Sequence, residues 1–225
     1  MKTNVKESKF SGIFLIGSKI ATINLAPGKR VYGEELVKEG KVEYRIWDIF
    51  RSKPAAAIKK GLKNFPIKKG NKILYLGIAS GTTASHFSDI IGKEGIIYGI
   101  DVAERVLKDL IHVAEKRGNI LPILSDARIP ENYANNILEK VDIVYCDVAD
   151  PDEVELFIRN CKMFLKEKGC GMIAIKSQSI DVTKDPKVIY KESRKKMEEA
   201  GFEILDFVEL DPYDKAHGFF VVRIN

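Results

Sequence analysis

The N-terminal part of the chain carries short apolar runs separated by turn residues. The runs GIFLIG, KIATINL and VEYRIWD lie between residues 10 and 48, and glycine or Pro-Gly turns separate them. Short β-rich runs with this punctuation are typical of a small antiparallel sheet. We therefore predict a small β-rich N-terminal domain over residues 1–53.

A helix and a basic loop are expected next. The segment RSKPAAAIKKGLKNFPIKKG is alanine-rich near its start and places Pro54 in the first turn of the predicted helix. Proline is well tolerated there because the first N–H groups of a helix have no intrahelical partner. We expect the main domain to span residues 54–225.

From residue 71 onward, apolar runs alternate with helical stretches. The predicted strands are KILYLGI, IIYGID, ILPILSDA, VDIVYCD, CGMIAIK, FEILDFVEL and HGFFVVRI, and a charged helix over residues 186–200 precedes the last two. Alternation of strand and helix favours parallel β-α units, whereas the last two strands lie too close together for a crossover helix and should pair antiparallel. The predicted fold is α/β, with a seven-stranded doubly wound sheet that contains one reversed strand.

Composition and charge limit the possible classes of protein. The 225 residues include 37 Lys and Arg against 32 Asp and Glu, a net charge of +5 that permits a polyanionic partner without demanding one. The three cysteines show no CxxC spacing and cannot all pair, so we expect no disulfide framework, no cysteine zinc site and a reducing cytoplasm. GIFLIG is far shorter than the ~18 apolar residues of a membrane span, so no membrane association is expected.

A glycine turn follows the first strand of the main domain. In LYLGIASGTT, Gly77 and Gly81 allow a tight turn in which backbone N–H groups approach a ligand. The spacing does not match G-x-G-x-x-G, and a close strand-to-helix turn without a ligand explains it equally well. The next strand ends at Asp101, where a carboxylate can accept hydrogen bonds from ribose hydroxyls. Together these features favour a nucleoside site.

Two further carboxylates follow neighbouring strands. Asp126 ends ILPILSDA, where it can take an adenine amino group, and Asp147 ends VDIVYCD, whereas Asp152 is expected to solvate a loop or cap a helix. Strand ends of an open α/β sheet meet at one crevice. Because no GK[ST] motif is present and an acidic mouth suits a cationic ligand, we predict S-adenosyl-L-methionine, with NAD as the alternative.

Lysine and histidine side chains add candidate chemistry at this edge. Lys176 ends CGMIAIK beside Asp147, and a desolvated lysine near a second cation, for which Lys53 is the candidate, can lose its proton and accept one from a hydroxyl. His217 is placed to complete the group, although solvated lysines and structural histidines are common. His86 and His112 are interpreted as packing or surface residues. The groups support inline displacement of a sulfonium methyl by an oxygen nucleophile, without a metal.

Four segments carry a resemblance to a known family: YLGIASGTTASHFSDIIG, IYGIDVAERVLKDL, NILPILSDARIPENY and VDIVYCDVADP. They are flanked by RSKPAAAI and HGFFVV. Together these segments resemble archaeal fibrillarin over nearly the whole chain. The resemblance implies a Rossmann-like class I methyltransferase domain and S-adenosylmethionine-dependent RNA 2′-O-methylation of ribosomal and transfer RNA. It also implies selection of targets by box C/D guide RNA, a Nop-family scaffold and a kink-turn-binding ribosomal-type protein as partners. The Gly- and Arg-rich tail of nucleolar relatives is absent, which favours a cytoplasmic archaeal form.

The resemblance also implies which residues form the site. A catalytic tetrad falls on Lys53, Asp147, Lys176 and His217. Cofactor contacts fall on Gly77, Ala79, Gly81, Thr82, Thr83, Asp101, Val102, Asp126, Ala127 and Asp147, with Asp101 at a position where the family commonly has Glu. No metal is expected.

Three points stay open. The basic clusters KKGLK, IKKGNK and ESRKK either contact RNA or form a solvated face. The two alternatives are equally expected, because no RNA-reading module is present. The alternatives to a methyltransferase are a non-catalytic subunit of a ribonucleoprotein and an NAD-linked oxidoreductase.

Overall fold

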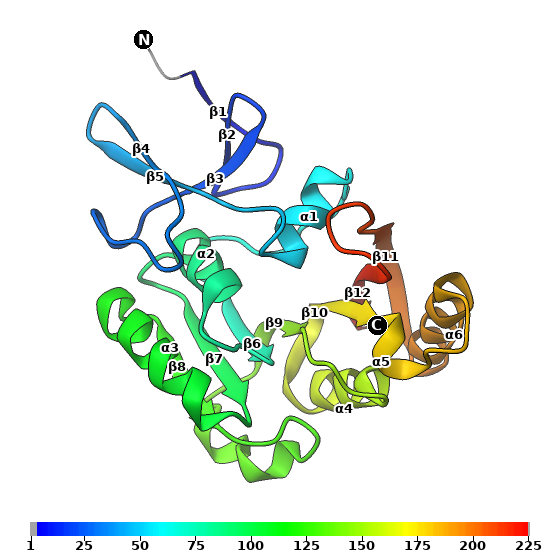
Figure 1. Cartoon of the computed structure of the whole chain (residues 1–225). Helices are drawn as coiled ribbons and strands as arrows, with labels where there is room; N and C mark the ends of the chain where they lie inside the picture. The colour runs from blue at the N-terminus through cyan, green and yellow to red at the C-terminus, as the bar shows by residue number, and fades with distance from the viewer. Residues whose placement is uncertain (1–3, 225) are drawn as a thin grey trace.

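The computed structural model describes residues 4–224 and contains two sheets (Figure 1). The N-terminal sheet is antiparallel, in the order β1-β2-β3-β5-β4. Its strands are β1 (Val5–Glu7), β2 (Ile13–Ile16), β3 (Lys19–Ile23), β4 (Leu36–Glu39) and β5 (Val42–Ile46). The predicted β-rich N-terminal domain is confirmed. Strands β1 and β4 lie at its edges, are rich in charge and carry no apolar run, so the pattern did not indicate them.

Helix α1 (Lys53–Lys59) joins the two parts of the chain. Pro54 lies in its first turn, as predicted, and Ala55, Ala56 and Ala57 are fully buried. Alanine favours a helix and lets its backbone pack closely. The proposed division between residues 53 and 54 falls inside this first turn and stays a prediction.

The main sheet has seven strands in the order β11-β12-β10-β9-β6-β7-β8. They are β6 (Lys72–Leu76), β7 (Ile96–Asp101), β8 (Ile120–Leu124), β9 (Val141–Cys146), β10 (Leu165–Lys176), β11 (Phe202–Glu209) and β12 (His217–Ile224). Strand β12 is antiparallel to both β10 and β11, so the predicted α/β fold with one reversed strand is confirmed. Strand β10 begins before the predicted residue 170, with a register shift between Leu165 and Cys170.

Helices cover both faces of this sheet (Figure 1). They are α2 (Thr82–Ile91), α3 (Glu104–Arg117), α4 (Glu153–Phe164), α5 (Ser177–Ile180) and α6 (Pro186–Glu199), with 3₁₀ turns η1 (Pro130–Asn132) and η2 (Ala134–Asn136). Alternate strand residues enter two separate cores: Tyr75 packs with the core that includes α2, and Leu76 with the core that includes α4. Because successive side chains point to opposite faces and both faces are buried, the central strands are apolar throughout.

The order of strands determines where a site can form. After β6 the chain adds β7 and β8 on one side and then crosses to β9 on the other side. The carboxyl ends of β6 and β9 therefore flank a topological switch point, where open α/β sheets bind ligands. Within residues 4–224, no helix has the length and apolar character needed to cross a membrane.

Candidate active site

The turn after β6 is shaped by close packing. Gly77 has φ +77°, and a Cβ there would lie 2.5 Å from the carbonyl oxygen of Asp147, so no side chain fits. Ala79 has φ 52°, a left-handed conformation that is costly for a residue other than glycine, and its N–H donates to Asp101 Oδ2 at 2.8 Å. The turn thus ties the end of β6 to the ends of β7 and β9.

A cavity of about 340 Å³ lies at these strand ends. Of the residues expected to bind the cofactor, its lining includes Gly77, Ala79, Asp101, Val102, Asp126, Ala127 and Asp147. The other three lie outside the lining. Thr83 is buried and donates to Ser52 Oγ at 2.9 Å, Gly81 precedes α2, and Thr82 lines a neighbouring groove. The assignment of cofactor contacts stays a prediction.

The acidic residues of the cavity differ in how much of their hydrogen-bonding capacity is used. Asp101 accepts from the N–H groups of Ala79 and Ala103, which orients its carboxylate and leaves lone pairs for a ligand. Asp126 is held by the guanidinium of Arg128 at 2.7 Å, and hydrogen bonds from Arg128 hold the pKa of Asp126 below its usual value. Arg128 also lies 4.0 Å from Asp150. Nothing in the sequence singles out Arg128, because an exposed arginine after a strand is ordinary.

Lys53 and Asp147 form a direct ion pair. Lys53 Nζ lies 2.6 Å from Asp147 Oδ1, and Tyr145 donates to Asp147 Oδ2 at 3.2 Å. Burial opposes the charge of Lys53, but the charge and hydrogen bond of Asp147 outweigh it and raise the pKa of Lys53. Lys53, expected as the second cation near Lys176, is therefore a cation paired with Asp147.

Lys176 and His217 lie opposite each other in the β10–β12 ladder. His217 Nδ1 lies 3.0 Å from Asp214 Oδ1 and 2.8 Å from the carbonyl oxygen of Lys215. The Lys176 ammonium makes no hydrogen bond or ion pair with any residue from 4 to 224. Asp214, in the loop between β11 and β12, was not singled out from the sequence, and it interacts electrostatically with both Lys53 and Lys176. The structure thus pairs Lys53 with Asp147 and Lys176 with His217, and Asp214 contacts the second pair and interacts with the first.

Glu153 is a further acidic group behind this site. It is the first residue of α4, is fully buried, and accepts from the Lys176 N–H at 2.9 Å through Oε1, while Oε2 has no protein partner. Burial is the main cause that raises its pKa to about 8, and the charge of Asp147 adds to it. Glu153 is therefore protonated at neutral pH. Nothing in the sequence singles out Glu153, because an acid in the first turn of a helix is usually an exposed charge.

Asp152, just before Glu153, is an exposed loop residue. It occupies the N-cap position of α4 without a capping hydrogen bond from its side chain. Of the two expected roles, the exposed side chain fits solvation of a loop and makes no cap, while Asp150 Oδ1 accepts from the Asp152 N–H at 2.9 Å. His86 is fully buried and His112 is exposed, so both histidine interpretations are confirmed.

The strand order and the cavity at the switch point define a Rossmann-like methyltransferase fold. An S-adenosylmethionine-dependent methyltransferase from Aquifex aeolicus shares the fold, with a TM-score of 0.54 at 17% identity over 71% of this chain and 85% of that chain. A family model described as Fibrillarin matches residues 5–225. The chain belongs to the fibrillarin family.

Individual relatives agree over nearly the full length. The fibrillarin-like rRNA/tRNA 2′-O-methyltransferase of Pyrococcus furiosus is 53% identical over 97% of this chain and 98% of its own. The fibrillarin pre-rRNA processing protein of Methanococcus jannaschii has a TM-score of 0.93 at 49% identity, covering 98% of this chain and 97% of that one. Aeropyrum pernix fibrillarin, solved with natively bound S-adenosyl-L-methionine, has a TM-score of 0.90 at 48% identity, with 97% of each chain covered.

Proposed function

We propose that this protein is an S-adenosylmethionine-dependent RNA 2′-O-methyltransferase that acts on ribosomal and transfer RNA. One observation carries the proposal: a cavity at the switch point adjoins the Lys53–Asp147 ion pair, and at the end of β10 the ammonium of Lys176 has no partner among residues 4–224. Relatives that are about half identical to this chain over nearly its whole length are named rRNA/tRNA 2′-O-methyltransferases, which supports the reaction and its substrates. The structure of the Aeropyrum pernix protein with its bound nucleoside supports the cofactor.

The residues of the cavity fit this cofactor. Gly77 has no side chain to fill the cavity, and Asp101 offers a carboxylate to ribose hydroxyls. Asp126 keeps acceptor capacity beside Arg128, since each carboxylate oxygen has two lone pairs. We assign the remaining expected cofactor contacts, Val102 and Ala127 in the lining and Gly81, Thr82 and Thr83 in the turn and at the start of α2, to the same ligand.

Bound S-adenosylmethionine supplies a methyl group that its sulfonium charge already activates. The acceptor 2′-hydroxyl oxygen forms the new C–O bond as the C–S bond breaks, and its proton must leave. We assign acceptance of that proton to Lys176 Nζ, while Asp147 holds Lys53 at a defined distance and His217 orients the end of β12. Proton transfer of this kind contributes about 10²- to 10⁴-fold to a rate.

The protein works as the catalytic subunit of a box C/D ribonucleoprotein in the cytoplasm. Base pairing with a guide RNA selects the target, and a Nop-family scaffold and a kink-turn-binding ribosomal-type protein complete the particle. A fibrillarin/Nop5p complex with a TM-score of 0.88 at 36% identity, covering 97% of this chain and 100% of that one, supports the scaffold. The free cysteines Cys146, Cys161 and Cys170 are consistent with a reducing compartment.

The test is methyl incorporation from tritiated S-adenosylmethionine in a particle reconstituted with guide RNA, target RNA and both partner proteins. We expect Asp147→Asn and Lys176→Ala each to lower the rate by about 10²-fold or more, since each removes a group at the reacting hydroxyl. Lys195→Ala, an exposed lysine of α6, is the matched control. Full activity of both site variants would reject the assignment. A wild-type particle that assembles but incorporates no methyl would indicate a non-catalytic subunit.

A further inference from the structure

The basic clusters that are contiguous in sequence are partly neutralised in the structure. Carboxylates pair with Lys69, Lys72, Arg194, Lys195 and Lys196. A cation that already has a carboxylate partner gains less from a phosphate group. The clusters most visible in the sequence therefore offer a weak surface to a polyanion.

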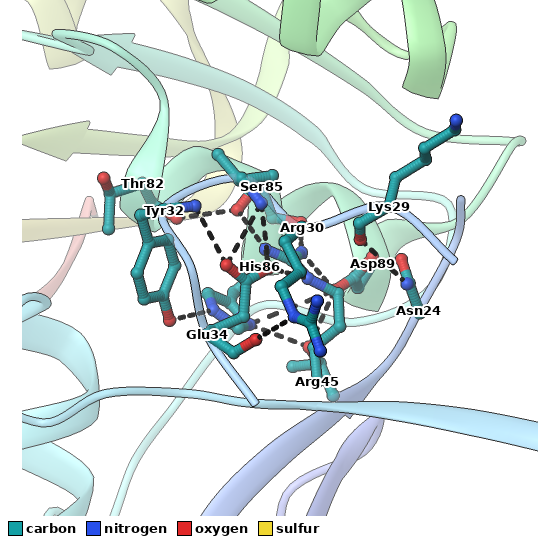
Figure 2. Close-up of polar contacts among 12 residues, drawn as sticks. Asn24, Lys29, Arg30, Tyr32, Glu34, Arg45, Thr82, Ser85, His86 and Asp89 are labelled. Carbon is teal, nitrogen blue, oxygen red and sulfur yellow. Dashed lines mark hydrogen bonds and ion pairs between the residues drawn. The ribbon is translucent and has the colours of Figure 1, made fainter. Parts of the chain in front are cut away.

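Folding assembles a different basic surface from distant segments. A groove of about 400 Å³ lies between the loop of residues 26–32, the start of α2 and the side of α3. Its lining includes Lys29, Arg30, Arg51 and Lys116, and we call this the cationic groove. Figure 2 shows Lys29 and Arg30 on the loop, with the ammonium group of Lys29 directed away from the buried polar residues.

The charges of the cationic groove are not compensated by the protein. None of its four defining cations has a carboxylate partner among residues 4–224. Arg30 Nε donates to the carbonyl oxygen of Glu34 at 2.9 Å, and Arg51 lies over the ring of Tyr32 at 5.7 Å, contacts that orient each guanidinium and leave its charge intact. Asp109 is the acidic residue of the lining.

The cationic groove adjoins the candidate active site at Arg51. Arg51 lines both this groove and a smaller cavity of about 130 Å³ whose lining includes Lys53, Asp147 and Asp214. A chain with one sugar at Lys53 and Asp147 that continued past Arg51 would enter the groove that Lys29 and Lys116 line. A polymer with one negative charge on each unit matches this group of cations.

We propose that the cationic groove binds the sugar–phosphate backbone of the RNA that flanks the methylated nucleotide. This inference rests on the proposed function and adds a position for the flanking RNA. Phosphate contacts of this type set the register of a nucleic acid without reading its sequence, which suits an enzyme whose target is chosen by a guide.

The first test measures binding of a fluorescein-labelled RNA duplex to the full chain by anisotropy, between 50 and 200 mM salt. Lys29→Ala/Lys116→Ala removes two exposed ammonium groups that form no ion pair within residues 4–224. The matched control Lys69→Ala/Lys195→Ala removes two ammonium groups that pair with carboxylates. We expect the groove variant to bind about 10-fold more weakly, with a slope of log K against log salt that is smaller by about 2. The control should keep the wild-type slope.

The second test measures methylation by the reconstituted particle. The groove variant should raise KM for the target RNA about 10-fold and leave kcat and the affinity for S-adenosylmethionine unchanged. Equal slopes and equal KM values in an active particle would overturn the inference and leave the proposed function standing. Normal RNA binding with weakened assembly onto a partner protein would also overturn it, in favour of an acidic protein segment. A wild-type particle without activity would count against the proposed function. The anisotropy measurement would still test whether the cationic groove binds RNA.

Discussion

Two clusters of charged residues use their hydrogen-bonding capacity differently. At the junction between the N-terminal sheet and α2, Arg45 lies 2.6 Å from Glu34 and 2.8 Å from Asp89 (Figure 2). Arg117 also pairs with Asp89. In the candidate active site, Lys176 has no partner among residues 4–224, and Glu153 keeps one buried oxygen without a partner. Both clusters lie on packed elements. The difference indicates that the first cluster serves the fold and the second is kept for a ligand.

The junction cluster also balances its charge. Two arginines face two carboxylates, and His86 adds none, because burial and the two arginines hold its pKa well below the usual value. His86 instead lies 2.8 Å from Thr22 Oγ1 and 2.7 Å from the Tyr32 hydroxyl. Burial and Arg45 lower the pKa of Arg117 to about 9, which still leaves it charged at neutral pH. A closed arrangement of this kind has no capacity left for a substrate.

The largest effect on stability is expected from breaking the junction cluster. Asp89→Asn leaves Arg45 and Arg117 buried without their shared carboxylate, and loss of one partner in a buried ion pair costs roughly 3–5 kcal/mol. Urea unfolding measures this change. The control Glu94→Ala breaks an exposed pair with Lys69 at 3.4 Å and should cost less than about 1 kcal/mol. A loss of the same size in both variants would mean that the junction cluster contributes nothing particular.

The next effect concerns Glu153, whose raised pKa makes stability depend on pH. Below pH 4.5 the carboxyl is protonated in both the folded and the unfolded chain. As the pH rises from 4.5 toward 8, the unfolded chain loses this proton and the folded chain retains it, so the free energy of unfolding falls. Glu153→Gln keeps the acceptor for the Lys176 N–H and has no proton to lose.

We expect Glu153→Gln to be more stable than the wild type at pH 8 by roughly 4 kcal/mol, with the difference shrinking toward pH 5. Thermal unfolding across this range measures it, and Glu155→Gln on the same helix, half-exposed and paired with Lys196, is the control. Parallel pH curves for Glu153→Gln and the wild type would contradict a protonated Glu153.

The smallest effect is expected at Asp101. Asp101→Asn keeps an acceptor oxygen for only one of the two N–H groups, those of Ala79 and Ala103, and loses the charge offered to the ribose. Affinity for S-adenosylmethionine should fall about 10-fold, which corresponds to about 1.4 kcal/mol. Isothermal titration calorimetry measures it, with the exposed Glu104→Gln as control. Unchanged affinity would remove Asp101 from the cofactor site.

Much of the fold follows from local pattern. The seven strands of the main sheet, the reversed β12 and the proline at the start of α1 could all be predicted, because apolar period and turn residues act over a few positions. The charged edge strands β1 and β4 could not, since only their pairing with β2 and β5 makes them strands. Asp101, Asp126 and Asp147 were placed at one edge because parallel strands end on the same side.

The sequence by itself determined the residue types, their order and the strand ends from which Asp147 and Lys176 extend. Tertiary structure decided which charges are paired: Lys53 with Asp147 and Asp89 with two arginines, while Lys29 and Lys116 form no ion pair within residues 4–224. Burial of Glu153 was also decided there. The physical reason is that the state of a charge depends on the solvent and on partners within a few ångströms, and residues distant in the chain supply those partners only after folding.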